Sequence, residues 1–179
     1  MATGIALLFN IRLPINFNSP YKSTSVINFW QKWHITLANF LTNYIYFPWV
    51  KSLKKVNFFK IMIIIFFVFL IAGIWHGPSW LYVIFGALHG SGLIANHVYR
   101  KFFDYKLNNY FACFLTFNYI NLTFIFFRSD SLDKALNIIK GMLGFNGFEL
   151  TSYFEDKIKI IAILLLAITV VFCFKNTSY

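Results

Sequence analysis

Four histidines are the residues of this sequence best suited to acid–base chemistry. They are His34, His76, His89 and His97. His76 ends the apolar run in FLIAGIWHGPSW and is followed directly by Gly77 and Pro78. Glycine lets the backbone turn and proline stops a helix, so this stretch predicts a histidine at a helix break. A neutral imidazole in such a place can act as a general base at pH 7.

The composition assigns the chain to the membrane proteins. It is 59% hydrophobic and 12% charged, and 24 of its 179 residues are Phe, whereas soluble domains are about 25% charged. The net charge is +10, and residues 1–109 carry ten Lys or Arg against Asp104 alone. These cations lie between apolar runs, which is typical of cytoplasmic loops beside anionic lipid. We therefore expect contact with membrane lipid and no binding of nucleic acid.

The membrane setting changes how the histidines are interpreted, because ionisable side chains in a membrane are costly and usually functional. We interpret His76, at the predicted helix break, as a catalytic candidate. His34 is a second candidate, since it flanks an aromatic stripe one turn from Trp30. His89 lies in a glycine-rich stretch, where it either functions or hydrogen-bonds across helices. His97 stands beside basic residues at the end of a span, and we expect it to be interfacial.

Other catalytic chemistry finds no support in the sequence. The six Asp and Glu residues all lie outside the apolar runs. No GxSxG, P-loop or HExxH motif is present, and Cys113 and Cys173 have neither metal-site nor redox spacing. We therefore expect no bound metal and no bound cofactor.

The N-terminal part of the chain precedes the strongest apolar runs. Residues 1–25 contain two prolines and an Asn/Ser cluster, and we expect an irregular lead-in. In residues 26–47, Trp, Leu and Tyr recur at helical spacing, which predicts an amphipathic or re-entrant helix. Ser25 is the expected N-cap of this helix, and Pro48 is expected to end it.

Four apolar runs are candidates for membrane spans, which need about 20 residues each. They cover residues 61–75, 79–97, 110–127 and 158–174, so that residues 61–127 form the core spans. Gly86 and Gly90 make a small-xxx-small pair that would let two helices approach closely. We therefore predict an all-α membrane protein with about four transmembrane helices.

The loops between the runs differ in charge. Residues 49–60 carry four Lys and residues 98–109 carry three basic residues, so both loops are predicted to be cytoplasmic. Residues 128–157 carry four basic and five acidic residues and are predicted to be the outer loop. Within that loop we expect a short amphipathic helix that begins at Ser131.

Three blocks of the sequence resemble the membrane-bound O-acyltransferase family, with the alginate O-acetyltransferase type as the nearest branch. They read NFWQKWHITLANFLTNYIYFP, AGIWHGPSWLYVIFGALHG and FIFFRSDSLDKALNIIKGMLG. The resemblance covers roughly residues 1–145. It implies several spanning helices around a funnel, and acyl transfer to a hydroxyl, often on an extracytoplasmic polysaccharide. The D-alanyl transfer protein of teichoic acid synthesis is a relative in the same family.

The resemblance also assigns roles to residues of this chain. The histidine of the family's Trp-His-Gly block matches His76, the expected catalytic residue, and the earlier Trp-His histidine matches His34. The expected acyl donor is a thioester such as acetyl-CoA, supplied from the cytoplasm as a substrate. A separate extracytoplasmic partner protein, a glycan acceptor and a multi-pass position in the bacterial cytoplasmic (inner) membrane are expected as well.

Some features depart from the family pattern. Thr42 and Asn43 stand where members commonly have Arg-Asp, and WVKS follows Pro48 where a Gly-rich turn is common. Because family members are far longer, we expect residues 1–179 to be one membrane domain, the C-terminal half of an acyltransferase, and inactive alone. The rival interpretations are a transporter or channel piece with a histidine-lined pathway and a non-catalytic structural subunit. Solute flux without acyl transfer would favour the former.

Overall fold

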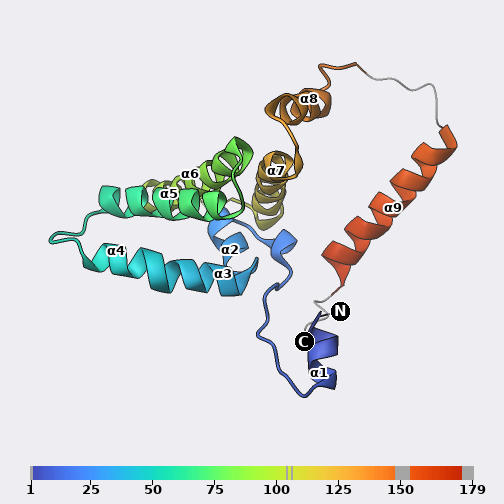
Figure 1. Ribbon diagram of the computed structural model, residues 1–179. Helices are drawn as coiled ribbons and strands as arrows, with labels where there is room; N and C mark the ends of the chain where they lie inside the picture. The colour runs from blue at the N-terminus through green and yellow to red at the C-terminus, as the bar shows by residue number, and fades with distance from the viewer. Residues whose placement is uncertain (1, 104, 106, 148–153, 175–179) are drawn as a thin grey trace.

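The computed structural model describes residues 2–103, 105, 107–147 and 154–174. These ranges contain helices and connecting turns and no strand, which confirms the predicted all-α class. Three helices are long and apolar enough to cross a membrane: α5 (Phe58–Trp75), α6 (Trp80–Phe102) and α7 (Asn109–Arg128). The fourth expected span falls on α9 (Phe154–Cys173), most of which lies away from these three helices in Figure 1, while Phe172 near its end packs on Phe117 of α7 with ring centroids 5.9 Å apart.

Each of the three spans begins at a polar residue that satisfies free backbone groups. The side-chain oxygen of the N-cap accepts a hydrogen bond from a backbone N–H two or three residues later, at 2.8–3.3 Å; the N-caps are Asn57, Ser79 and Asn108. Such capping is worth about 1 kcal/mol per helix. Between α5 and α6 the chain turns at Gly77, whose φ of 148° favours a residue without a Cβ.

Helices α5 and α6 form a hairpin held together by glycines. A Cβ on Gly73 would collide with the carbonyl oxygen of Tyr82, and one on Gly86 would collide with that of Phe69. The predicted close approach through the Gly86 and Gly90 pair is therefore confirmed, because both glycines are buried against α5. At the far end, the Lys101 ammonium lies 3.9 Å from the centre of the Phe58 ring. The two basic loops thus leave the hairpin at the same end.

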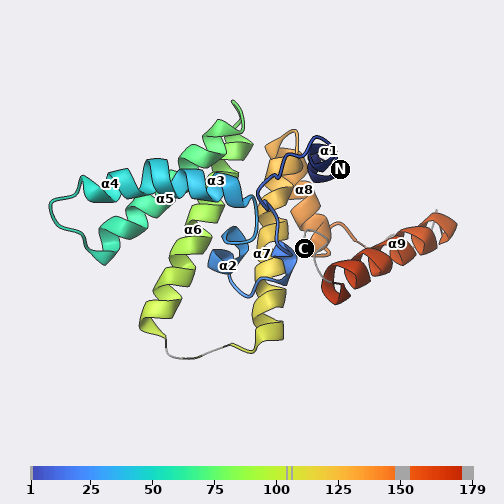
Figure 2. The same cartoon turned by 90° about the horizontal axis from the view of Figure 1, so that it is seen from below.

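The third span completes the core together with a short helix, α2 (Val26–Trp30). Helix α7 packs on α6 where the Tyr119 ring covers Gly92, and its hydroxyl donates to the carbonyl of Leu88 at 2.6 Å. Helix α2 lies beside both helices (Figure 2) and buries Phe29. The described core is therefore made by α2, α5, α6 and α7.

The single amphipathic helix predicted for residues 26–47 is wrong. The chain breaks at residues 31–34 and then forms α3 (Ile35–Phe40), the π-helix η2 (Leu41–Tyr46) and α4 (Phe47–Lys51). The lead-in stabilises the break, because the Asn18 N–H donates to the carbonyl of Lys32 and the Ile35 N–H donates to that of Asn16, at 2.8 and 2.9 Å. The local periodicity could not show these distant partners.

Pro48 does not end the helical segment, contrary to expectation. It lies in the first turn of α4, where a residue without an N–H is tolerated. The preceding π-helix widens the backbone, and its Leu41 packs on Ile64 and Val68 of α5. As a result α3, η2 and α4 run alongside α5 in Figure 1.

The lead-in of residues 1–25 is not wholly irregular. It contains α1 (Ala2–Leu8) and a 3-10 turn, η1 (Pro20–Lys22). The first of these follows from the high helix propensity of Ala and Leu. The predicted cap is confirmed, since the Ser25 hydroxyl accepts from the Asn28 N–H at 3.0 Å.

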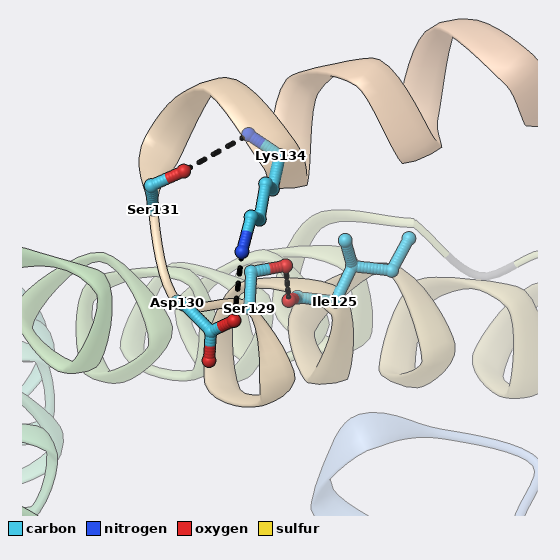
Figure 3. A network of polar contacts seen from close by, with 5 residues as sticks. All are labelled: Ile125, Ser129, Asp130, Ser131 and Lys134. Carbon is cyan, nitrogen blue, oxygen red and sulfur yellow. Dashed lines mark hydrogen bonds and ion pairs between the residues drawn. The ribbon is translucent and has the colours of Figure 1, made fainter.

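The short helix predicted after the third span is also confirmed, as α8 (Leu132–Met142). The Ser131 hydroxyl accepts from the Lys134 N–H at 3.3 Å, and the Lys134 ammonium pairs with Asp130 at 3.0 Å (Figure 3). Ala135 is fully buried and anchors α8 against Leu81 and Phe126. Residues 148–153 of the predicted outer loop lie outside the described ranges.

Gly86→Ala should destabilise the fold, because the added Cβ meets the backbone of α5, which cannot move like a side chain. Overpacking of this kind costs about 1–3 kcal/mol. The effect is measured as a change in melting temperature in detergent, where unfolding is detected as the loss of monodisperse protein on heating. Gly141→Ala in α8 is the matched control, since its Cβ meets only the Asn146 amide at 3.6 Å. Equal melting temperatures for the two variants would contradict the hairpin packing.

Candidate active site

His34 lies at the break between α2 and α3 in an unusual backbone conformation. Its φ of 45° and ψ of 53° are left-handed, which is uncommon for a residue with a side chain and is found mostly at functional sites. The ring lies 6.0 Å from that of Phe17, measured between centroids. Its Nδ1 is buried and has no hydrogen-bond partner within the described part of the chain. A buried polar atom of this kind needs an explanation, and a catalytic role is one that fits a histidine.

His76 caps the C-terminus of α5 in the turn between two spans, as the sequence predicts. Its backbone N–H donates to the carbonyl of Gly73 at 3.0 Å. The ring is half-buried among aromatic side chains, with centroid distances of 5.0 Å to Phe127 and 6.0 Å to Phe85. Burial lowers the pKa of His76, and nearby His34 lowers it further. The neutral imidazole, which can accept a proton, is thereby favoured.

The fold brings the two predicted histidines into the same region of the molecule. His34 is close enough to act electrostatically on His76, although the two are far apart in the sequence. Aromatic contacts run between the two segments, because Trp33 packs on Phe124 at 5.3 Å, Phe124 lies 6.4 Å from Phe127, and Phe127 contacts His76. Two imidazoles that lie near each other in different surroundings can divide the roles of proton acceptor and hydrogen-bond donor.

His89 does not join this pair and instead links three helices. It is fully buried, and its Nδ1 accepts a hydrogen bond from the Trp30 indole N–H at 3.2 Å. Its Nε2 lies 3.0 Å from the Thr123 hydroxyl, which donates to the carbonyl of Ile120. Because an indole can only donate, Nδ1 must be the acceptor and the proton must be on Nε2. The geometry thus favours the cross-helix interpretation of His89.

A residue that the sequence reasoning missed holds the other end of α2. The Asn96 side-chain oxygen, on α6, accepts from the backbone N–H groups of Val26 and Ile27 at 2.6 and 3.3 Å. These are N-terminal groups of a helix, which need such partners. The sequence signal for this role is an asparagine inside an apolar run, where a polar side chain needs a hydrogen-bond partner.

A cavity of about 440 Å³ runs between the hairpin and the segment from α2 to η2. Ile61 and His97 line it at the end of the hairpin where the basic loops lie, and Gln31 and Ile35 line it at the break that carries His34. Most of the other lining side chains are apolar. The cavity therefore joins one end of the hairpin to the segment that bears a candidate histidine.

The fold and this site define a helical membrane protein whose two candidate histidines lie at breaks in the helical backbone. A family model for the membrane-bound O-acyltransferases matches residues 1–130. The chain belongs to that family.

Individual relatives agree with this assignment. A peptidoglycan O-acetyltransferase of Helicobacter pylori is 40% identical over 100% of this chain and 38% of its own length. A probable alginate O-acetylase of Azotobacter vinelandii is 30% identical, over 96% of this chain and 34% of its own length. A teichoic acid D-alanyltransferase of Streptococcus thermophilus is 26% identical, over 70% of this chain and 35% of its own length. The chain thus spans between a third and two fifths of these relatives.

His34→Gln should raise the pKa of His76 toward its ordinary value of 6.5, because it removes one of the two influences that lower it. Burial, the larger influence, remains, so the shift should be partial. A pH titration of histidine ring signals by NMR, with the His76 signal assigned by mutation, measures the change. His97→Gln, at the other end of α6, should leave the His76 titration unaltered. An identical pKa for His76 in both variants would show that His34 and His76 do not interact.

Proposed function

We propose that this chain supplies the histidine pair of a membrane O-acyltransferase, which transfers an acyl group, such as acetyl, from a thioester to a hydroxyl of an extracytoplasmic polysaccharide. The observations that carry the proposal are the buried Nδ1 of His34, which has no partner in the described structure, and the position of His76, near enough to His34 for their charges to interact. The names of the relatives support it, since they specify O-acetylation of peptidoglycan and alginate and D-alanylation of teichoic acid.

In the proposed reaction His76 acts as the general base. Its imidazole takes the proton of the acceptor hydroxyl as the hydroxyl oxygen attacks the thioester carbonyl carbon. A ring N–H of His34 donates to the oxygen that becomes negative. When the carbon–sulfur bond breaks, the imidazolium of His76 returns the proton to the leaving thiolate. The products are an ester and a free thiol, and acid–base catalysis of this type is worth about 10²–10⁴-fold.

The donor and the acceptor are proposed to arrive from opposite ends of the hairpin. A thioester such as acetyl-CoA would place its acyl arm in the 440 Å³ cavity, whose Ile61 and His97 lie at the end of the hairpin that carries the basic loops predicted to be cytoplasmic. This arrangement fits an acyl chain, because apolar side chains form most of the lining. The thioester is a substrate, so the proposal includes no resident cofactor.

The acceptor side is proposed to lie near the junction of α7 and α8. A hollow of about 400 Å³ there is lined by aromatic, charged and amide side chains, among them Asn121, Phe124, Arg128 and Asp130. Such side chains suit a hydroxyl-rich glycan, and Phe127, which contacts His76, precedes Arg128. A separate extracytoplasmic partner protein and a place in the bacterial cytoplasmic membrane complete the proposal.

His76→Ala should lower acyl transfer by about 10²–10⁴-fold, because no other group would take the hydroxyl proton. Native-length protein reconstituted in vesicles with a labelled acyl thioester and a glycan acceptor measures the transfer. Asn118→Ala is the control and should retain activity, since Asn118 is exposed on α7, bonds only to the carbonyl of Phe114 in its own helix and lines neither proposed substrate site. Undiminished transfer by His76→Ala would contradict the assignment. Solute flux without covalent transfer would favour the rival transporter interpretation.

A further inference from the structure

We propose that His89 is a positioning residue, which holds the break that carries His34 opposite the turn that carries His76. This inference rests on the proposed function, in which His34 and His76 act together on the substrate. The proposal is based on three consecutive hydrogen bonds through the fully buried His89. The Trp30 indole N–H donates to His89, His89 bonds to the Thr123 hydroxyl, and that hydroxyl donates to the carbonyl of Ile120.

The chain of hydrogen bonds fixes the helix that precedes His34. Helix α2 is held to α6 at both ends, at Val26 by Asn96 and at Trp30 by His89. These two anchors lie seven residues apart on α6, which is two turns along one face. Because α2 ends at Trp30, the position of the following break depends on the anchor at His89.

His89 also contacts the surroundings of His76. Its ring packs on Phe85 with centroids 4.5 Å apart, and Phe85 lies 6.0 Å from the His76 ring and 4.9 Å from Phe127. One side of His89 therefore supports the segment of His34, and another side supports the wall beside His76.

The hydrogen bonds at the two ring nitrogens of His89 depend on each other, because the ring carries a single proton when neutral. A histidine at this position can therefore link Trp30 and Thr123. Nδ1 can accept from Trp30 only while the proton stays on Nε2, and this proton needs the Thr123 oxygen as its acceptor. Removing that oxygen leaves a buried N–H without a partner in the network. Moving the proton to Nδ1 would set two donors against each other. In either case the disturbance reaches Trp30 and the break beyond it.

The proposal is tested with Thr123→Val, compared with Thr116→Val on the same helix. Both threonines are buried and donate to their own helix backbone. Of the two, Thr123 is the one that hydrogen-bonds to His89 in the described structure. Thr123→Val should lower kcat about 10–100-fold at unchanged KM for the donor, as expected for misplaced catalytic groups. Thr116→Val should have wild-type kcat, and Thr123→Ser, which keeps the hydroxyl, should restore it. Trp30→Phe breaks the same chain from its other end and provides a second variant, should Thr123→Val not fold.

A second measurement does not depend on acyl transfer. In native-length protein with Cys113→Ala and Cys173→Ala, the rate of reaction of His34→Cys with a small thiol reagent reports the position of the break. Thr123→Val should change this rate at least about threefold, and Thr116→Val should not. If the unmutated protein transfers no acyl group, the proposed function fails, while the labelling result still decides the positioning role. Equal effects of the two valine variants, or no effect of either, would overturn the proposal.

Discussion

Gly73 and Gly86 let the backbones of α5 and α6 meet without side chains between them, and most of the other features depend on this contact. It closes the hairpin at the end where His76 caps α5, so the histidine is held in a tight turn rather than on a free loop. It also leaves the remaining faces of α6 to other partners. Tyr119 covers Gly92 on one side, and Asn96 and His89 hold α2. A broken helix can lie against apolar spans here because its backbone and side chains find partners on α6 and in the lead-in.

The histidines of the core region show how surroundings decide what one residue type does. His89 has a donor at one ring nitrogen and an acceptor at the other, so its hydrogen-bonding capacity is used within the protein. His34 has a buried Nδ1 without a partner in the described structure, and His76 is half-buried beside aromatic rings. A satisfied imidazole stabilises the packing of helices, whereas an unsatisfied one remains available to a substrate. This contrast separates the structural histidine from the two proposed to act in chemistry.

Much of this arrangement could be predicted from the sequence because its signals are local. Apolar runs gave the spans, Ser25 and Ser131 gave two helix starts, and a histidine before Gly-Pro marked the turn at His76. The break at residues 31–34 could not be predicted, since its hydrogen bonds come from Asn16 and Asn18 in another segment. Pro48 does not end the segment as its residue type predicts, because proline ends a helix in its interior but is tolerated in a first turn. The role of His89 depends on Trp30 and Thr123, which only the tertiary fold brings to it.

The central claim is that His34 and His76 form one catalytic unit, and a double-mutant cycle tests it most directly. The rate of acyl transfer is measured for His34→Ala, His76→Ala and the double variant, in native-length protein and under the same conditions. Residues that act as a unit are strongly non-additive. The account predicts that the double variant loses no more activity than the more damaged single variant. Losses that multiply, as they do for independent sites, would contradict it.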